Sequence, residues 1–144
     1  MIAVDTNILV YAHRADSAFH ARAHARLRAL AESGSAWAIP WPCVHEFFAI
    51  VTHPRIYVPH TPIEAALDQL EAWLESPTLV LLAEGEDGWP ALRRSIEQAR
   101  AQGPRIHDAR IAALCTAHGV SELWSADRDF SRFGDIRVVN PVAK

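Results

Sequence analysis

The chain has 144 residues, of which half are hydrophobic and 22% are charged, and its formal net charge at pH 7 is −3. That length allows one compact domain with a hydrophobic core and excludes two, so residues 1–144 are expected to form a single domain. No apolar run approaches the roughly 20 residues that cross a membrane. No basic leader precedes the first apolar segment either, so we expect neither a membrane span nor a signal peptide.

Strands and helices are predicted to alternate along the chain, because short apolar runs are separated by segments with helical periodicity. In chain order, the expected elements are a strand at 2–4, helices at 5–14 and 17–33, a strand at 36–39, helices at 42–51 and 61–75, a strand at 78–82, helices ending near 103 and spanning 107–118, and strands at 122–125 and 136–139. This order predicts an α/β domain with a mainly parallel central sheet and helices on both faces.

Local signals support several of these boundaries. Gly34 and Gly119 follow expected helices and are typical helix-stop residues. The run Thr61-Pro62-Ile63-Glu64 has the form of a capping box with proline at the first helical position. Cys43 and Cys115 fall in two different expected helices, which favours reduced, buried thiols and a cytoplasmic protein.

Four carboxylates lie where acids are not ordinarily expected. Glu46 and Asp108 fall on apolar helix faces, where a carboxylate is costly unless it is paired or bound to a metal. Asp5 ends the first strand and Asp127 follows the fourth, and ligands of open α/β sheets bind beyond the carboxyl ends of the strands. Taken alone, Asp5 has an ordinary interpretation as a helix cap, and Asp127 and Asp129 have one as exposed turn residues. Together they predict one acidic site.

The pattern resembles the PIN-domain nucleases, over essentially the whole chain. Asp5-Thr6-Asn7 after the first strand is similar to the opening motif of that family, and Glu46 in Glu-Phe-Phe and Asp108 match later family positions. The run Ser125-Ala126-Asp127-Arg128-Asp129-Phe130 matches the last motif, with serine where the family more often has threonine. The spacing is that of short bacterial members, which are mostly toxins of VapBC-type toxin–antitoxin pairs.

Converging carboxylates must be protonated or held by a cation, because two of them about 4 Å apart repel by roughly 4 kcal/mol. An all-oxygen site suits Mg²⁺ or Mn²⁺ rather than zinc. The resemblance implies that Asp5, Asp108 and Asp127 hold the metal and that Glu46 completes the site and orients the attacking water. We expect Asn7, Ser125 and Asp129 to be supporting or substrate residues, with helix capping the favoured role for Asn7.

The activity implied by the resemblance is metal-dependent hydrolysis of RNA. A water nucleophile makes no use of the ribose 2′-hydroxyl, so the choice of RNA over DNA rests on the resemblance alone. With the five site acids set aside, twelve acids remain against fourteen bases, so the net charge does not exclude a nucleic-acid substrate. The resemblance implies a cognate antitoxin and a second copy of the chain as partners. Apolar stripes on the second helix (Leu27 and Leu30) and the fourth (Leu67, Leu70 and Leu74) either form the dimer interface or pack on the sheet of their own chain. The alternatives are a non-catalytic PIN-like interaction module and a PIN nuclease outside toxin–antitoxin biology.

Other motifs carry weaker signals. His20 and His24 have a zinc-compatible spacing, but they lie among arginines on what is expected to be a solvated face. Trp37 and Trp41 have aromatic faces for stacking bases, and core packing is the favoured use of both. An aspartyl-phosphate enzyme would need a nearby lysine, and the only lysine is Lys144; a P-loop motif is absent.

Overall fold

The computed structural model describes all residues, Met1–Lys144. Its centre is a five-stranded, wholly parallel sheet with the order β3-β2-β1-β4-β5. The strands are β1 (Ile2–Val4), β2 (Trp37–Pro40), β3 (Leu79–Leu82), β4 (Glu122–Trp124) and β5 (Arg137–Val139). The chain therefore moves from β1 to one side of the sheet and later returns to the other side, which confirms the predicted parallel α/β architecture.

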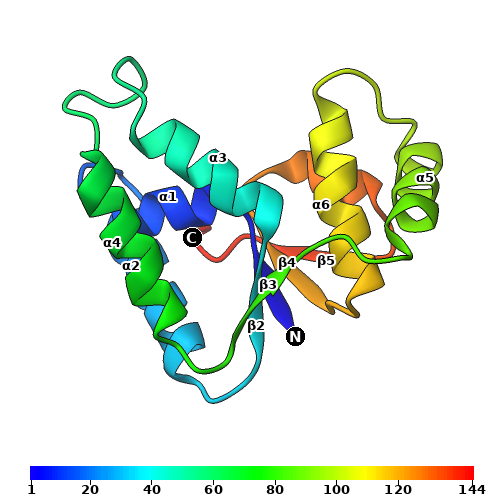
Figure 1. Ribbon diagram of the computed structural model, residues 1–144, viewed down its shortest axis with the longest axis horizontal. Helices are drawn as coiled ribbons and strands as arrows, with labels where there is room; N and C mark the ends of the chain where they lie inside the picture. Colours follow the sequence, from blue (N-terminus) through cyan, green and yellow to red (C-terminus); the bar gives the residue numbers. More distant parts are fainter.

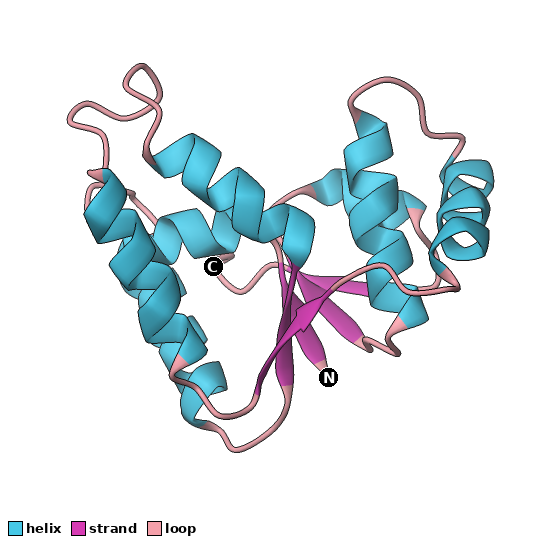
Figure 2. Ribbon diagram, viewed as in Figure 1, coloured by secondary structure: helices cyan, strands magenta, loops and turns pink.

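Six α-helices flank the sheet. They are α1 (Thr6–His13), α2 (His20–Glu32), α3 (Trp41–Val51), α4 (Ile63–Leu74), α5 (Gly88–Ala99) and α6 (Arg105–Ala117), and a short 3-10 helix, η1 (Arg128–Arg132), lies in the expected 126–134 loop. Figures 1 and 2 show α1 to α4 on one side of the sheet and the α5–α6 pair on the other. No helix is long and apolar enough to cross a membrane.

The predicted boundaries hold within a few residues. Ala3 and Val4 are fully buried, as expected of a strand covered on both faces, and Asp5 caps α1. Gly34 and Gly119 adopt positive φ angles of 81° and 68°, the conformation that makes glycine suitable after a helix. The largest differences are at α2, which begins three residues later than predicted, and at α5, which ends before Gly103.

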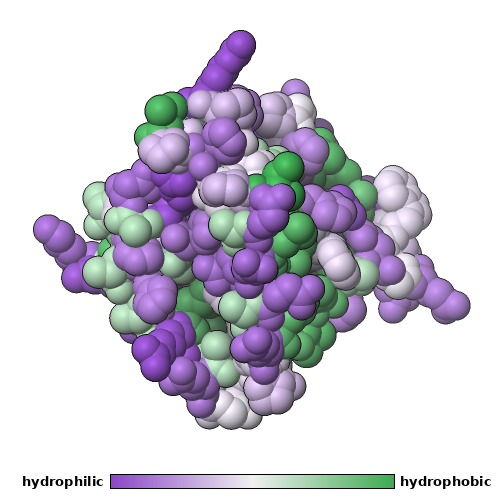
Figure 3. Space-filling model, turned by 60° about the vertical axis from the view of Figure 1, so that its left-hand side comes forward, coloured by the Kyte–Doolittle hydropathy of each residue, from purple (hydrophilic) through white to green (hydrophobic).

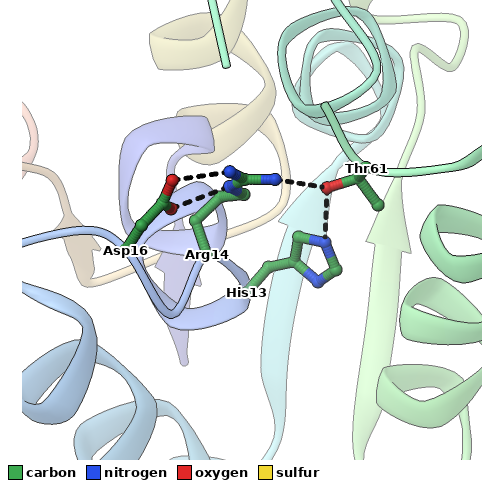
Figure 4. A network of polar contacts seen from close by, with 4 residues as sticks. All are labelled: His13, Arg14, Asp16 and Thr61. Carbon is green, nitrogen blue, oxygen red and sulfur yellow. Dashed lines mark hydrogen bonds and ion pairs between the residues drawn. The ribbon is translucent and has the colours of Figure 1, made fainter. Parts of the chain in front are cut away.

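The predicted capping box at the start of α4 is wrong. Pro62 occupies the N-cap position, and no side chain caps the helix. The hydroxyl of Thr61 is instead buried against α1, 3.1 Å from Nε2 of His13, and accepts a hydrogen bond of 3.3 Å from Arg14. Arg14 also forms a bidentate ion pair with Asp16 (Figure 4). The hydroxyl of Thr61 therefore bonds to His13 and Arg14 instead of the first turn of α4, and it joins the loop before α4 to the end of α1.

One of the two apolar stripes expected at a dimer interface is not available for it. Leu27 and Leu30 of α2 are buried in the core of the same chain, so α2 cannot share them with a second copy. On α4, Leu67 is 51% exposed and Leu74 is 41% exposed. The face that Figure 3 brings forward, on the side of α2 and α4, shows apolar patches among polar side chains. The stripe on α4 is thus the one left open.

Both cysteines behave as predicted. Cys43 in α3 and Cys115 in α6 are free thiols and completely buried. Burial raises the pKa of Cys115 to about 12 and that of Cys43 well above its ordinary value. These thiols are therefore packing groups in the folded protein and not nucleophiles.

Candidate active site

The site lies at the point in the sheet where the order of strand addition reverses. Strands β1 and β4 are neighbours although more than a hundred residues separate them, and β2 and β3 extend to one side while β5 extends to the other. The backbone N–H of Asp5 donates to the carbonyl of Trp124 at 2.9 Å. Residues that follow β1 and β4 therefore meet at the carboxyl edge of the sheet, the usual position of a ligand crevice in such folds.

Asp5 is the most buried of the acids, with 6% of its surface exposed. Its Oδ1 accepts from the backbone N–H of Thr6 at 2.8 Å and from Sγ of Cys43 at 3.6 Å, and its Oδ2 accepts from the hydroxyl of Ser125 at 2.8 Å. Burial raises the pKa of Asp5, although the hydrogen bond from Ser125 acts in the opposite direction. Oδ1 therefore accepts two hydrogen bonds, which occupy both of its lone pairs. Oδ2 accepts only one, so its second lone pair is free to bind a cation.

Ser125 connects three parts of the site. Its hydroxyl donates to Asp5 and accepts from Nδ2 of Asn7 at 3.4 Å and from the backbone N–H of Asp127 at 3.0 Å. Asn7 also accepts from the backbone N–H of Ala126 at 3.3 Å. Asn7 is thus not the helix cap that the sequence favoured: Asp5 caps α1, and Asn7 holds the loop after β4.

Asp127 and Asp129 sit on the loop after β4, and both are half-buried. Oδ1 of Asp127 caps η1 by accepting from the backbone N–H of Asp129 at 2.8 Å, so its Oδ2 remains free. Asp129 forms a 3.0 Å ion pair with Arg105 of α6. This ion pair connects the loop to α6 and partly neutralises the charge of Asp129.

Glu46 reaches the site from α3. Its Oε2 accepts from the hydroxyl of Thr6 at 3.1 Å. The sequence argument that Glu46 lies on a buried apolar face is wrong, because the side chain is exposed. Of its helical neighbours only Cys43 is buried, whereas Ala49 borders open solvent. Glu46 therefore faces the cleft instead of the core.

Asp108 lies in the first turn of α6 and is half-buried, which agrees with its predicted position beside an apolar stripe. Burial raises its pKa to about 6, and the negative charges of Asp127, Asp5 and Asp129 add to that effect. Arg105 lowers the pKa only in part. Asp108 is therefore close enough to the other three acids for their charges to be felt, so α6 completes the acidic cluster.

A cleft of about 830 Å³ opens in front of these carboxylates. One wall is α3 and the other is the start of α6 with the turn before it. Glu46, Asp108 and Asp129 line the cleft together with the cationic groups of Arg105 and Arg110. His45 and His107 lie on opposite walls. The cleft is thus polar and carries both signs of charge.

The donor set fits a hard divalent cation. Every candidate ligand is a carboxylate oxygen, and neighbouring acids add to the rise in the pKa of Asp5 and of Asp108. In this side-chain arrangement no three His, Cys, Asp or Glu side chains are close enough to hold one ion together. Mg²⁺ typically keeps several waters and uses only one or two direct carboxylates, so a wide cluster is compatible with it.

Sequence reasoning missed two contributors. Thr6 holds Glu46, and Cys43 donates to Asp5. Thr6 lies inside the recognised Asp5-Thr6-Asn7 run, so it was within reach of a motif argument. Cys43 lies one helical turn before Glu46, but nothing in that spacing indicates a contact with the first strand.

The sequence of this chain is similar to those of curated bacterial ribonucleases. It is 35% identical over 142 residues to Ribonuclease VapC43 of Mycobacterium tuberculosis, which covers 99% of this chain and 96% of the relative. It is 32% identical over 138 residues to Ribonuclease VapC48 of the same species, with 95% and 94% covered. In each comparison the similarity therefore covers nearly the whole of this chain and of the relative.

The fold is also similar to a solved structure. The crystal structure of VapBC2 from Rickettsia felis, bound to a DNA fragment from its promoter, contains a chain that superposes with a TM-score of 0.69. That alignment covers 97% of this chain and 98% of the other, at 22% identity. In addition, the PIN domain family matches residues 2–136, which include all five acids of the site. The chain therefore belongs to the PIN-domain family.

Proposed function

We propose that this chain is an endoribonuclease that depends on Mg²⁺ or Mn²⁺ and acts in the cytoplasm as the toxin of a type II toxin–antitoxin pair. The observation that carries the proposal is that acids from four segments act on one another at the carboxyl edge of the sheet: Asp127 and Asp5 help to raise the pKa of Asp108 to about 6, and Glu46 raises that of Asp5. The curated relatives named as ribonucleases support RNA as the substrate.

The hydrogen bonds of each carboxylate indicate whether it would bind the metal or accept a proton. Oδ2 of Asp5, Oδ2 of Asp127 and the carboxylate of Asp108 would hold the metal directly or through water. Glu46, fixed by Thr6, is placed to accept a proton from the attacking water. When bound, the metal lowers the pKa of a water molecule and stabilises the charge that develops on the phosphate.

The cleft suits a single RNA strand. Glu46, Asp108 and Asp129 line it, and Arg105, His107 and Arg110 on α6 supply cationic and hydrogen-bonding groups for phosphates on either side of the scissile one. Arg110 is held by a bidentate contact with Glu84, and Arg105 by Asp129. Both guanidinium groups are therefore oriented before substrate binds, which lowers the entropic cost of binding.

The proposed partners follow from two surfaces. An open cluster of carboxylates attracts a guanidinium as readily as a metal, so an antitoxin arginine entering the cleft would block it. The exposed stripe of α4, which includes Leu67 and Leu74, is the surface proposed for a homodimer. Light scattering at high micromolar concentration tests the dimer, and a monomer there would argue against it; Leu67→Asp should dissociate the pair.

The decisive experiment is cleavage of single-stranded RNA by the purified chain. We expect cleavage with Mg²⁺ or Mn²⁺, none in EDTA, and a loss of at least 100-fold in Asp108→Asn, on the order of removing one key catalytic group. Asp68→Asn, which changes an exposed acid on α4, is the matched control and should remain active. Absent cleavage by the folded wild type would favour a non-catalytic interaction module, whereas cleavage that persists in EDTA would refute the metal dependence.

The biological role needs a separate test. Expression of the wild-type chain should arrest growth, Asp108→Asn should be harmless, and co-expression of the neighbouring reading frame should restore growth. A wild type that cleaves RNA in vitro and is soluble yet harmless in the cell would instead favour a PIN nuclease outside toxin–antitoxin biology.

A further inference from the structure

Trp41 occupies an unusual position beside the cleft. Trp37, four residues earlier, is fully buried and donates from its indole N–H to Ser76, whereas Trp41 is 36% exposed. The sequence favoured core packing for both residues, and the structure corrects this for Trp41. Trp41 is the first residue of α3 and follows directly after β2, so it lies at the same edge of the sheet as the carboxylates.

The indole of Trp41 contacts the imidazole of His45, one helical turn further along α3. Their ring centroids are 5.9 Å apart and the ring planes are tilted by 46°. His45 lines the cleft and directly precedes Glu46 in the sequence. The aromatic pair Trp41–His45 is therefore continuous with the wall that carries an acid of the site.

The backbone under this pair is rigid. Trp41 lies between Pro40, which caps α3, and Pro42, which occupies its first turn. Proline restricts its own φ angle, so the residues on both sides of Trp41 have little backbone freedom. Further along the wall, Glu46 is held by Thr6. The aromatic pair is thus preorganised relative to the acids.

We infer that the Trp41–His45 pair stacks a nucleobase of the single-stranded RNA next to the scissile phosphate, and so contributes to the choice of cleavage site. This inference rests on the proposed function. Stacking on aromatic side chains is the common way to hold unpaired bases, and it combines with cationic groups that track the backbone. Here the two roles fall on opposite sides of the cleft. On α3, His45 lines the wall and Trp41 packs against it at the rim, and on α6 Arg105, His107 and Arg110 supply the polar groups.

The chemistry of the cleft favours RNA over a protein segment as the occupant of the pair. The residues that line the cleft are mainly polar and charged. The apolar ones are few: Pro42, Ala49, Pro104 and Ile111. A second hollow, of about 380 Å³ between α5, α6 and the turn before α5, is lined more by apolar groups and is bordered by Trp89. That tryptophan is 65% exposed but lies outside the acidic cleft. It provides a matched control.

The test is binding of a 5′-labelled single-stranded RNA, measured by fluorescence anisotropy with the full chain in the inactive Asp108→Asn background. We expect Trp41→Ala to weaken binding by about 10- to 100-fold, in line with the loss of one base–aromatic stack. Trp41→Phe should retain most of the affinity, and Trp89→Ala should bind as before. The melting temperature of each variant establishes that it is folded.

An abasic substitution separates stacking from a structural role. Replacing the nucleotide beside the cleavage site by an abasic one should weaken binding to the tryptophan form as much as Trp41→Ala does, and should have no further effect on the Trp41→Ala variant. Equal losses in both proteins would overturn the inference, as would a Trp41→Ala variant that binds RNA normally. If that variant instead lost affinity for the antitoxin, the pair would be a protein contact. Failure of the Trp41 form itself to bind RNA would overturn the proposed function as well.

Discussion

Replacing Asp108 by asparagine should stabilise the metal-free protein at neutral pH. The pKa of Asp108 is raised from 3.8 to about 6, mainly by burial and then by the charges of Asp127, Asp5 and Asp129. A gap of two pH units corresponds to about 3 kcal/mol at 1.36 kcal/mol per unit. Because Asp108 is only half-buried, solvent screening reduces this to about 1.5 kcal/mol. For a chain of this length that is an increase in Tm of about 3–6 °C.

The pH dependence has a definite sign. The folded protein binds the proton of Asp108 more tightly than the unfolded chain does, so this group favours folding fully below about pH 4. The contribution is lost as pH rises through 6, where the folded carboxyl ionises. The advantage of Asp108→Asn in EDTA should therefore be largest near pH 7.5 and vanish near pH 4.

The assay is thermal unfolding in EDTA across pH 4–8, for the wild type, Asp108→Asn and the exposed control Asp68→Asn. Added Mn²⁺ should raise the Tm of the wild type by mass action, and that of Asp108→Asn much less. A variant that is less stable than the wild type at pH 7.5 would show that Asp108 is a structural group, and the reasoning from mutual repulsion would be refuted. Asp5→Asn is a poorer probe, because its amide would face the Ser125 hydroxyl that now donates to Asp5.

Three further outcomes are expected. Ser125→Ala should lower the stability by about 1–3 kcal/mol and should also lower RNA cleavage, because it removes the buried donor to Oδ2 of Asp5. Ser125→Thr keeps the hydroxyl and should restore both, so equal defects in the two variants would contradict this. Cys43 and Cys115 should not react with a thiol reagent at pH 8 while the protein is folded. Both thiols should react once the protein is unfolded, and rapid labelling of the native protein would show that they are not buried. Thr61→Val should lower the free energy of unfolding by about 1–3 kcal/mol in chemical denaturation, while Thr61→Ser should be nearly neutral if the hydroxyl is what matters.

Much of the site followed from local patterns in the sequence. A residue that follows closely on a buried strand lies near that strand's carboxyl end, so the predicted strands by themselves place Asp5 and Asp127 at the sheet edge. The alternation of elements likewise predicted a parallel sheet. Helical periodicity placed Asp108 beside an apolar stripe, and its half-burial agrees with that.

Only the tertiary structure decided which faces meet. The stripes of α2 and α4 look alike in sequence, yet Leu27 is buried and Leu67 is exposed. Glu46 has apolar helical neighbours but faces the cleft, and Trp41 is a third exposed although it follows a buried strand. The hydroxyl of Thr61 bonds to α1 and not to its own helix. Periodicity tells which residues share a face, but what covers that face depends on contacts between segments far apart in the chain, and these form only when the whole sheet is assembled.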